Sequence, residues 1–271
     1  MSPLILWHGW GMHPSVWDSL VMQLGEQGIV ARAQALPGYA ENIPEYAHHD
    51  TQKGTTIADM LNAQVDSMMD RLHQELSIDG IAPTKITLCA WSLGALLAMY
   101  AAQRYPDKIE RLILIGATPS FVQRADWSHG MAEDALAEFS GAVAHDPDLA
   151  LKRFITLFNQ GDRYSRAIVR QLGQMQTALS SPMQPSVQLL LEGLTLLRDV
   201  DLRKIVPTLH QPTLLLHGAN DPLMPLAAAQ WLVENLPKAQ LRILPEAAHV
   251  PFLSDTAYCV EAIASMIAQA L

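Results

Sequence analysis

Ser92 lies at the centre of the pentapeptide AWSLG, between an apolar run typical of a strand and a longer stretch typical of a helix. Nucleophilic serines occur in such strand-to-helix turns, written G-x-S-x-G, because the tight turn has room only for small residues two positions away. Ala90 replaces the first glycine and is also small, so we interpret Ser92 as a nucleophile. The alternative is a serine that only caps the helix, a position where this residue type is common.

A serine hydroxyl is a weak nucleophile at neutral pH and needs a base, which in turn needs an acid to orient it. Asp221 follows the apolar run 213–216, and His249 follows the run 241–244. All three residues would therefore leave the same edge of a parallel sheet, in the expected order of serine, acid and histidine. We predict Ser92, Asp221 and His249 as a catalytic triad. Taken alone, Asp221 would be interpreted as a turn residue and His249 as a solvated loop histidine.

Acyl transfer also requires N–H donors for the oxyanion that forms at the attacked carbonyl. The expected donors are the backbone N–H of the residue after the nucleophile and one from the loop that follows an early strand. Leu93 provides the first, and the loop HGWG at 8–11 provides the second, which we assign to Trp10. A glycine-rich turn anchored by a tryptophan is the structural alternative for that loop.

The elements that must position these residues are short apolar runs that alternate with stretches of helix length. Near-continuous apolar runs are typical of a sheet that is covered by helices on both faces. The alternation predicts an α/β fold with a mostly parallel sheet. The predicted strands are 4–7, 29–31, 85–90, 112–116, 213–218 and 241–244, and two of the predicted helices are 56–76 and 93–105.

The alternation is interrupted after residue 118, where no strand-like run occurs and apolar residues recur near helical spacing. We therefore predict a helical lid inserted into the core. Its predicted helices are 131–143, 148–158 and 164–179. The predicted domains are a core of residues 1–118 and 187–271 and a lid of residues 119–186.

The composition argues against several classes of function. The chain has 271 residues, of which 49% are hydrophobic and 17% charged, so it can bury a core and is not intrinsically disordered. Its formal net charge of −9 would repel a phosphate backbone, which argues against nucleic acid as a partner. The first residues lack a basic region and a long apolar run, so we expect a cytoplasmic protein without a membrane segment. His48 and His49 beside Asp50 lack a spaced third ligand, so we expect no metal and no cofactor.

Six short motifs, spread along the chain, together resemble one known family. They are HGWG at 8–11, LPGY at 36–39, AWSLG at 90–94, YPDKIERLILIGATP at 105–119, HGANDPLMP at 217–225 and AAHVPF at 247–252. This set resembles the α/β-hydrolase family over essentially the whole chain, and the resemblance implies that fold and hydrolytic chemistry at Ser92. Two features depart from the family pattern: Ala90 in the turn, and a start at the strand before HGWG, where members usually have a preceding β-hairpin.

Within that family, the chain is most similar to the carboxylesterases of biotin synthesis. This similarity rests on HGWG followed by Trp17, on Trp91 before the serine, on Val200-Asp201-Leu202-Arg203 and on AAHVPF. It implies a serine carboxylesterase that hydrolyses pimeloyl-acyl carrier protein methyl ester to the acid and methanol, with acyl carrier protein as its partner. Esterases, aminopeptidases and carbon–carbon bond hydrolases that act on small molecules share several of these motifs. A non-catalytic binding protein of the same fold is a further alternative.

Residues 152–170 of the predicted lid are strongly basic. The cations are Lys152, Arg153, Arg163, Arg166 and Arg170, against Asp162 as the single acid. Arg163, Arg166 and Arg170 have the i, i+3, i+7 spacing of one helix face, which would either be solvated or dock an acidic partner. The resembling carboxylesterases hold the acidic carrier protein with lid arginines, which implies that role for Arg166 and Arg170.

Aromatic residues offer candidate contacts to an acyl chain between lid and core. We predict Trp10, Trp91 and Phe154 as substrate contacts, and packing within the lid is the alternative. Cys89 lies in a predicted buried strand, so we interpret it as a core residue and not as a nucleophile. We expect the protein to be a monomer.

Overall fold

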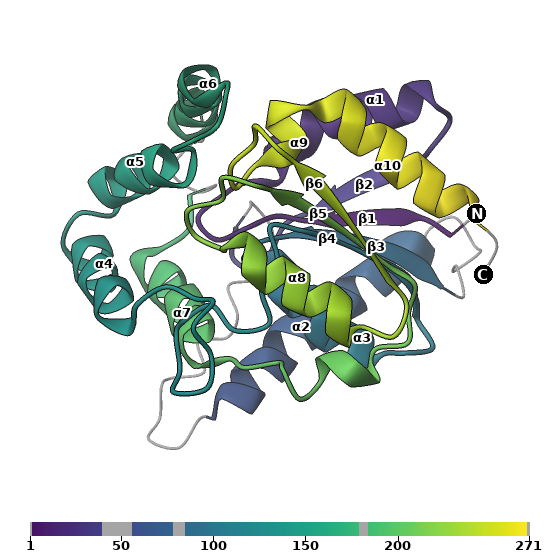
Figure 1. Cartoon of the computed structure of the whole chain (residues 1–271), viewed down its shortest axis with the longest axis horizontal. Helices are drawn as coiled ribbons and strands as arrows, with labels where there is room; N and C mark the ends of the chain where they lie inside the picture. The colour runs from purple at the N-terminus through teal and green to yellow at the C-terminus, as the bar shows by residue number, and fades with distance from the viewer. Residues whose placement is uncertain (1, 40–55, 78–84, 179–183, 270–271) are drawn as a thin grey trace.

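A parallel sheet of six strands lies at the centre of the residues described by the computed structural model, which are 2–39, 56–77, 85–178 and 184–269 (Figure 1). The strands are β1 (Leu4–Trp7), β2 (Ala31–Gln34), β3 (Ile86–Trp91), β4 (Ile109–Ile115), β5 (Thr213–Gly218) and β6 (Ala239–Leu244). Their order is β2-β1-β3-β4-β5-β6, and every neighbouring pair is parallel. The predicted α/β fold with a parallel sheet is confirmed.

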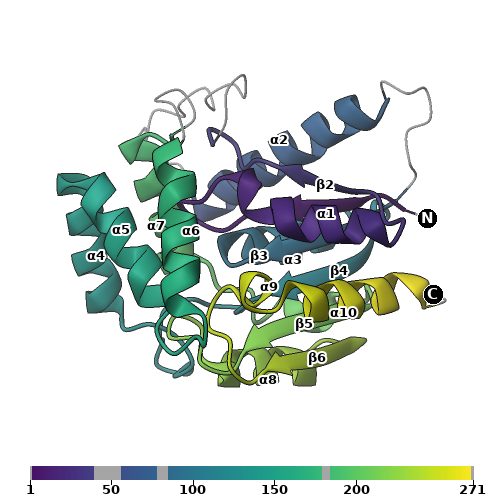
Figure 2. The ribbon, with the colours of Figure 1, turned by 90° about the horizontal axis from the view of Figure 1, so that it is seen from above.

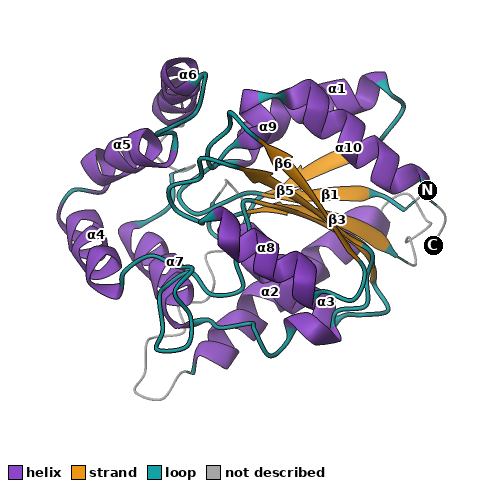
Figure 3. Ribbon diagram, viewed as in Figure 1, coloured by secondary structure: helices purple, strands orange, loops and turns teal. Residues whose placement is uncertain are grey.

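Helices cover both faces of this sheet (Figures 1 and 3). On one face lie α1 (Asp18–Glu26), α9 (Pro251–Ser254) and α10 (Thr256–Ala268), and on the other lie α2 (Ile57–Ser77), α3 (Leu93–Arg104) and α8 (Leu226–Asn235). The central strands β3 and β5 are buried along their whole length, which explains their continuous apolar sequences. Within the described ranges, no helix is both long and apolar enough to span a bilayer.

The two edge strands begin at positions that differ from the prediction. β2 begins at Ala31 rather than at residue 29, and β6 begins at Ala239, two residues before the predicted run. The central strand β4 also begins early, at Ile109, three residues before its predicted run. Polar side chains such as Arg32 and Arg242 lie within the edge strands, and Arg111 lies within β4. A search for continuous apolar runs therefore finds each strand but not always its first residues.

Four α-helices of the described residues lie between β4 and β5, and three of them fall in the segment 119–186 that was predicted to be a lid. They are α4 (Glu133–His145), α5 (Pro147–Phe158), α6 (Ser165–Ala178) and α7 (Val187–Asp199). α4 contacts α5 and α7, and α5 contacts α6, so the four helices form one group beside the sheet (Figure 2). The first three lie within two residues of the predicted helices. α7 falls beyond the predicted boundary at residue 186, and the domain boundaries stay a prediction.

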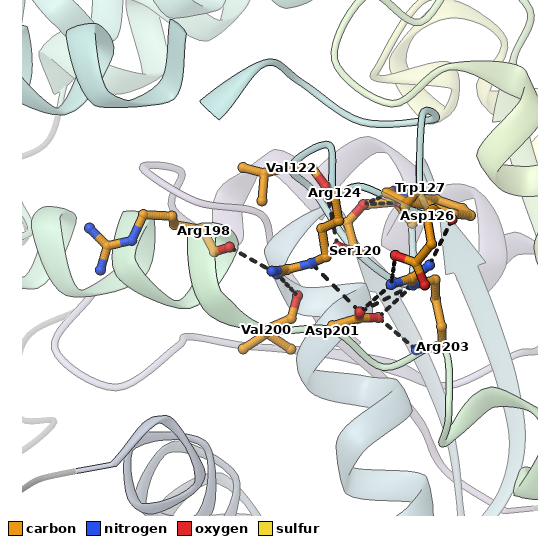
Figure 4. A network of polar contacts seen from close by, with 10 residues as sticks. Ser120, Val122, Arg124, Asp126, Trp127, Arg198, Val200, Asp201 and Arg203 are labelled. Carbon is orange, nitrogen blue, oxygen red and sulfur yellow. Dashed lines mark hydrogen bonds and ion pairs between the residues drawn. The ribbon is translucent and has the colours of Figure 1, made fainter. Parts of the chain in front are cut away.

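A network of arginines and carboxylates joins the chain before α4 to the chain after α7 (Figure 4). Arg203 pairs with Asp201 at 2.7 Å and with Asp126 at 2.9 Å, and its guanidinium lies 5.5 Å from the ring centre of Trp127. Arg124 adds a longer contact of 3.6 Å to Asp201. Two residues that support the closer resemblance, Asp201 and Arg203, thus tie together the two ends of the inserted helices.

Candidate active site

Ser92 occupies a sharp turn between the end of β3 and the start of α3. Its backbone angles are φ 59° and ψ −122°, and no other non-glycine residue in the described ranges has a positive φ. Such a conformation costs about 1–3 kcal/mol and persists only where the surroundings fix it. The Ser92 N–H donates to the Ile115 carbonyl at 3.1 Å, and a Cβ on Gly94 would lie 2.5 Å from the His8 carbonyl oxygen. The turn therefore forms with Ala90 in place of the usual glycine, and Gly94 lets α3 approach β1.

His249 and Asp221 lie in the loops after β6 and β5, and a hydrogen bond joins them. His249 Nδ1 is 2.7 Å from Asp221 Oδ2, and both side chains are buried. The other carboxylate oxygen accepts from the N–H groups of Leu223 and Met224, each at 2.9 Å. Burial by itself would raise the pKa of Asp221, but His249, His217 and the backbone donors together hold this pKa below its usual value. The carboxylate is therefore ionised and accepts the Nδ1–H of His249.

The second ring nitrogen of His249, Nε2, is buried and has no hydrogen-bond partner among the described residues. Because Nδ1 carries the proton, Nε2 presents a lone pair that can accept another. Ser92 bonds to Ile115 at the end of β4, and a Cβ on the next residue, Gly116, would lie 3.1 Å from the His249 ring. Ser92, His249 and Asp221 thus gather at one edge of the sheet. Contacts between such groups often tighten only when substrate binds.

Two buried histidines that were not predicted as site residues support loops at this edge of the sheet. His217, in β5, has Nε2 2.8 Å from the Met224 carbonyl oxygen and 3.8 Å from Asp221 Oδ2. Burial lowers the pKa of His217 despite the nearby carboxylate, so the ring is neutral and donates to Met224. His8 accepts from the Leu36 N–H at 3.0 Å, and burial lowers the pKa of His8 to about 3. In both cases the sequence signal is a histidine at the end of an apolar strand and directly before glycine.

The HGWG loop passes close to Ser92. A Cβ on Gly9 would lie 3.0 Å from Ser92 Cβ, so the loop backbone borders the candidate nucleophile. The N–H groups of Trp10 and Leu93 form no hydrogen bond with a described residue, which leaves both donors available. The Trp10 indole N–H donates to the Leu190 carbonyl at 2.8 Å and anchors the loop to α7. The assignment of these two amides to an oxyanion hole stays a prediction.

A cavity of about 110 Å³ lies between the sheet and the inserted helices and reaches Ser92. Its lining consists of Trp10, Ser92, Phe121, Met131, Ala135, Leu136, Phe139, Phe154, Leu157, Leu194, Leu197 and Leu223. Apart from the serine, these side chains are apolar. Such a cavity favours a hydrocarbon chain and disfavours a charged group, which would lose its hydration there without gaining a partner.

Two of the three predicted aromatic contacts, Trp10 and Phe154, line this cavity, and their rings lie 5.1 Å apart. Trp91 does not line it. Its indole N–H donates to the His249 carbonyl at 2.8 Å, and its ring packs against His249 and Phe252. Successive side chains of a strand point to opposite faces, so the residue before Ser92 is directed behind the site. Trp91 thus supports His249 from the core, and its predicted role as a substrate contact stays a prediction without support from this cavity.

The predicted docking residues Arg166 and Arg170 are exposed on α6, opposite the buried side of that helix. Neither forms a hydrogen bond or an ion pair with another described residue. Arg163 was expected to share their helix face, but it precedes the helix by two residues and pairs with Glu246 at 2.6 Å. The helix itself therefore presents two unpaired arginines from the predicted set.

Neither a cluster of metal ligands nor a reactive thiol is found at this site in the described part of the chain. No cluster of three or more His, Cys, Asp or Glu residues there could hold a metal ion. His48, His49 and Asp50 lie outside the described residues. Cys89 is buried inside β3, where burial raises the pKa of its thiol and makes it a poor nucleophile.

Comparison with known proteins places this chain in a family. Residues 4–262 match the model of the Alpha/beta hydrolase family, which is most of the chain. The chain belongs to this family. The family resemblance seen in its motifs is confirmed.

Two curated relatives in this family are both named pimeloyl-[acyl-carrier protein] methyl ester esterase. The protein from Aromatoleum aromaticum is 37% identical over 269 residues, which is 97% of this chain and 97% of the relative. The protein from Nitrosomonas europaea is 34% identical over 251 residues, covering 93% of this chain and 90% of the relative.

Two solved structures agree with the fold. An esterase from Exiguobacterium antarcticum matches with a TM-score of 0.79 and 22% identity, covering 99% of this chain and 92% of the other. A bromoperoxidase from Bacillus anthracis matches with a TM-score of 0.81 and 19% identity over the same shares. At these identities the likeness extends to the fold alone.

Proposed function

We propose that the protein is a serine carboxylesterase of biotin synthesis whose substrate is pimeloyl-acyl carrier protein methyl ester. The observation that carries the proposal is that Ser92 borders an apolar cavity, while the buried His249–Asp221 pair lies at the same edge of the sheet. This arrangement supports ester hydrolysis through an acyl-enzyme. The substrate class is supported by the name that the two relatives share.

In the proposed first half-reaction, Ser92 Oγ attacks the ester carbonyl carbon while His249 Nε2 accepts the serine proton. The ionised Asp221 keeps Nδ1 protonated and stabilises the imidazolium that forms. The N–H groups of Trp10 and Leu93 donate to the carbonyl oxygen as it becomes negative. Collapse of the tetrahedral intermediate breaks the bond to the methoxy group, which takes the proton from His249 and leaves as methanol.

Water completes the proposed reaction. His249 Nε2 takes a proton from a water molecule whose oxygen attacks the carbonyl carbon of the acyl-enzyme. When the bond to Ser92 Oγ breaks, the serine recovers its proton from His249. The products are methanol and a carboxylic acid at the end of the chain that remains attached to the carrier.

The apolar cavity is proposed to hold the hydrocarbon part of the acyl chain. Each methylene buried from water contributes about 0.8 kcal/mol, so several together can hold the chain without any charged contact. Trp10 and Phe154 border the cavity beside Ser92, and we assign them as substrate contacts. The chain in this position would bring its terminal ester to the serine.

The carrier protein itself is proposed to dock on α6. Arg166 and Arg170 are exposed and unpaired within the described residues, and acyl carrier protein is strongly acidic. Opposite charges at the rim of an interface mainly speed encounter and fix orientation. Arginines are suited to this role because they remain charged and bind carboxylates with two N–H groups.

Methanol release from pimeloyl-acyl carrier protein methyl ester, measured beside a series of free p-nitrophenyl esters, tests the proposal. We expect methanol and free acid in equal amounts, with kcat/KM for the carrier-bound ester well above that for every free ester. No methanol from the carrier-bound ester, with rapid turnover of free esters, would favour the small-molecule esterase alternative.

A further inference from the structure

The turn between α5 and α6 lies against the two core loops that contain Asp221 and His249. Asn220, beside Asp221, donates from Nδ2 to the Gly161 carbonyl at 2.8 Å. The His249 N–H is 3.3 Å from the Phe158 carbonyl oxygen at the end of α5. A segment of the inserted helices therefore contacts the backbone on which the proposed triad is built.

Asp162 adds a buried carboxylate to this contact. It is the single acid of the basic segment 152–170, where solvent exposure would be expected, yet it is only 7% exposed. Its Oδ2 accepts from the Ala248 N–H at 2.9 Å and from the Ser254 hydroxyl. Its Oδ1 accepts from the Tyr164 N–H at 2.7 Å.

The two oxygens of Asp162 thus hold one N–H group of the turn and one N–H group of the His249 loop. An asparagine could not do this, because its amide would present NH₂ to one of the two N–H donors. Ala248 immediately precedes His249, and the N–H that Asp162 binds belongs to the peptide unit between Ala247 and Ala248, so the hydrogen bond fixes the backbone just before the residue that carries the imidazole. Ser254, at the end of α9, holds the far side of the same loop.

We propose that Asp162 is a positioning residue for His249. By holding Ala248 and Ser254 it sets the direction in which the imidazole faces Ser92 and Asp221, without touching substrate or exchanging a proton. This inference rests on the triad of the proposed function and adds a residue from the inserted helices to it. Docking of the α5–α6 turn becomes a condition for a correctly placed base.

Glu246 provides a matched comparison on the same pair of segments. It joins the His249 loop to the turn through Arg163, but the two side chains are 65% and 59% exposed. Exposed ion pairs of this kind contribute little because water and salt screen them. Glu246→Gln removes one negative charge from the contact, as Asp162→Asn does, and leaves the buried hydrogen bonds in place.

Hydrolysis of p-nitrophenyl butyrate tests the inference, since this ester needs no carrier protein. Asp162→Asn should lower kcat by about 10- to 100-fold through misplacement of His249, with KM changed by less than about threefold. Glu246→Gln should keep both constants within about twofold of the wild type. In a His249→Ala background, Asp162→Asn should lower the residual rate by less than about twofold, because no imidazole remains to be positioned.

If Asp162→Asn lowers kcat by the same factor with and without His249, or leaves kcat near normal, the inference about Asp162 is overturned and the proposed function is not affected. If Asp162→Asn does not fold, Ser254→Ala gives the same test. It removes one of the three hydrogen-bond donors to the Asp162 carboxylate and leaves the N–H groups of Ala248 and Tyr164 in place. It should lower kcat by about threefold in the wild type and have no effect in the His249→Ala background. No loss in the wild type would overturn the inference. A fully active His249→Ala enzyme would refute the proposed triad and this inference with it.

Discussion

The imidazole of His249 is held by contacts from several parts of the chain. Asp221 binds the ring at Nδ1. The Phe158 carbonyl accepts from the His249 backbone N–H, the Trp91 indole donates to the His249 backbone carbonyl, and Asp162 binds the backbone N–H of Ala248, the preceding residue. A ring fixed in this way has one tautomer and one orientation, which is what a general base beside a serine requires.

Because the three triad residues act as a unit, their losses should not multiply. We expect Ser92→Ala, His249→Ala and Asp221→Asn each to lower kcat for a p-nitrophenyl ester by about 10³-fold or more. Adding either of the latter two to Ser92→Ala should cost less than about another tenfold. Losses that multiply in the double variants would show that the residues act independently.

The buried histidine His8 should make stability depend on pH. Its pKa of about 3 in the folded chain lies below the ordinary value of 6.5, so below pH 6.5 the unfolded chain binds a proton that the folded chain does not. The free energy of unfolding should therefore fall as the pH is lowered from 6.5, by at most about 1.4 kcal/mol per pH unit from this residue. Urea titrations at about pH 7 and about pH 5 should show a weaker pH dependence for His8→Gln than for the wild type.

His210→Gln is the matched control for His8→Gln because His210 is exposed to solvent. It removes one imidazole without removing a buried contact, so a difference between the two variants reports on the buried position of His8. A His8→Gln variant with the same pH dependence as the wild type would contradict the assignment of a neutral, buried His8.

The residues that could be predicted from the sequence are those with a recognisable local setting. Ser92, Asp221 and His249 each follow an apolar strand, and their order along the chain is informative. Asp162 could not be predicted, because its partner Ala248 is 86 residues away and becomes a neighbour only when the turn docks. Its position among basic residues gives no sign in the sequence that the carboxylate is buried.

Among the secondary-structure elements, all six strands were recognisable as apolar runs, and the first three inserted helices were recognisable by their apolar spacing. The predicted starts of β2, β4 and β6 were wrong by two or three residues, because polar residues lie near the start of each strand. Arg163 was placed on a helix by its spacing, although the turn ends only at Ser165. Residue spacing alone does not show where a turn ends and a helix begins. In this turn, Asp162 accepts hydrogen bonds from the N–H groups of Tyr164 and Ser165.

α6 is the element whose charge should distinguish carrier-bound from free substrates. Arg166→Glu combined with Arg170→Glu should lower kcat/KM for pimeloyl-acyl carrier protein methyl ester by about tenfold or more, because like charges then face the acidic carrier. Hydrolysis of p-nitrophenyl butyrate should stay near the wild-type rate, since neither arginine lies at Ser92. Steady-state assays of the two substrates measure this directly.

Lys238→Glu combined with Arg242→Glu is the matched control for the charge reversal on α6. It changes the net charge by the same amount at β6, where both side chains are exposed. Activity with the carrier-bound ester should be retained in this control. If both double variants lose the same fraction of activity, net charge alone accounts for the effect and docking on α6 is refuted.

The whole molecule carries a formal net charge of −9, while segment 152–170 is locally basic with a balance of 5 − 1 = +4. An acidic carrier would thus be repelled by most of the surface and attracted over one region. Charges separated by more than about 10 Å are largely screened at 0.1 M salt, so the short-range attraction should decide the productive encounter.

Raising the salt concentration should therefore slow the reaction with the carrier-bound ester. From about 0.05 M to about 0.5 M salt, we expect kcat/KM for this substrate to fall severalfold as the attraction is screened. The rate with p-nitrophenyl butyrate, which is uncharged, should change little. A rise in kcat/KM for the carrier-bound ester with salt would indicate that the overall negative charge dominates instead.

The central claim, a serine nucleophile activated by His249 and Asp221, is tested most directly by covalent labelling with a fluorophosphonate. Mass spectrometry of the digested protein should find one adduct on the peptide that contains Ser92, with activity lost in proportion to labelling. His249→Ala should slow the labelling by about 10³-fold or more, because the hydroxyl then lacks its base. An adduct on another residue, or rapid labelling of Ser92 without His249, would contradict the account.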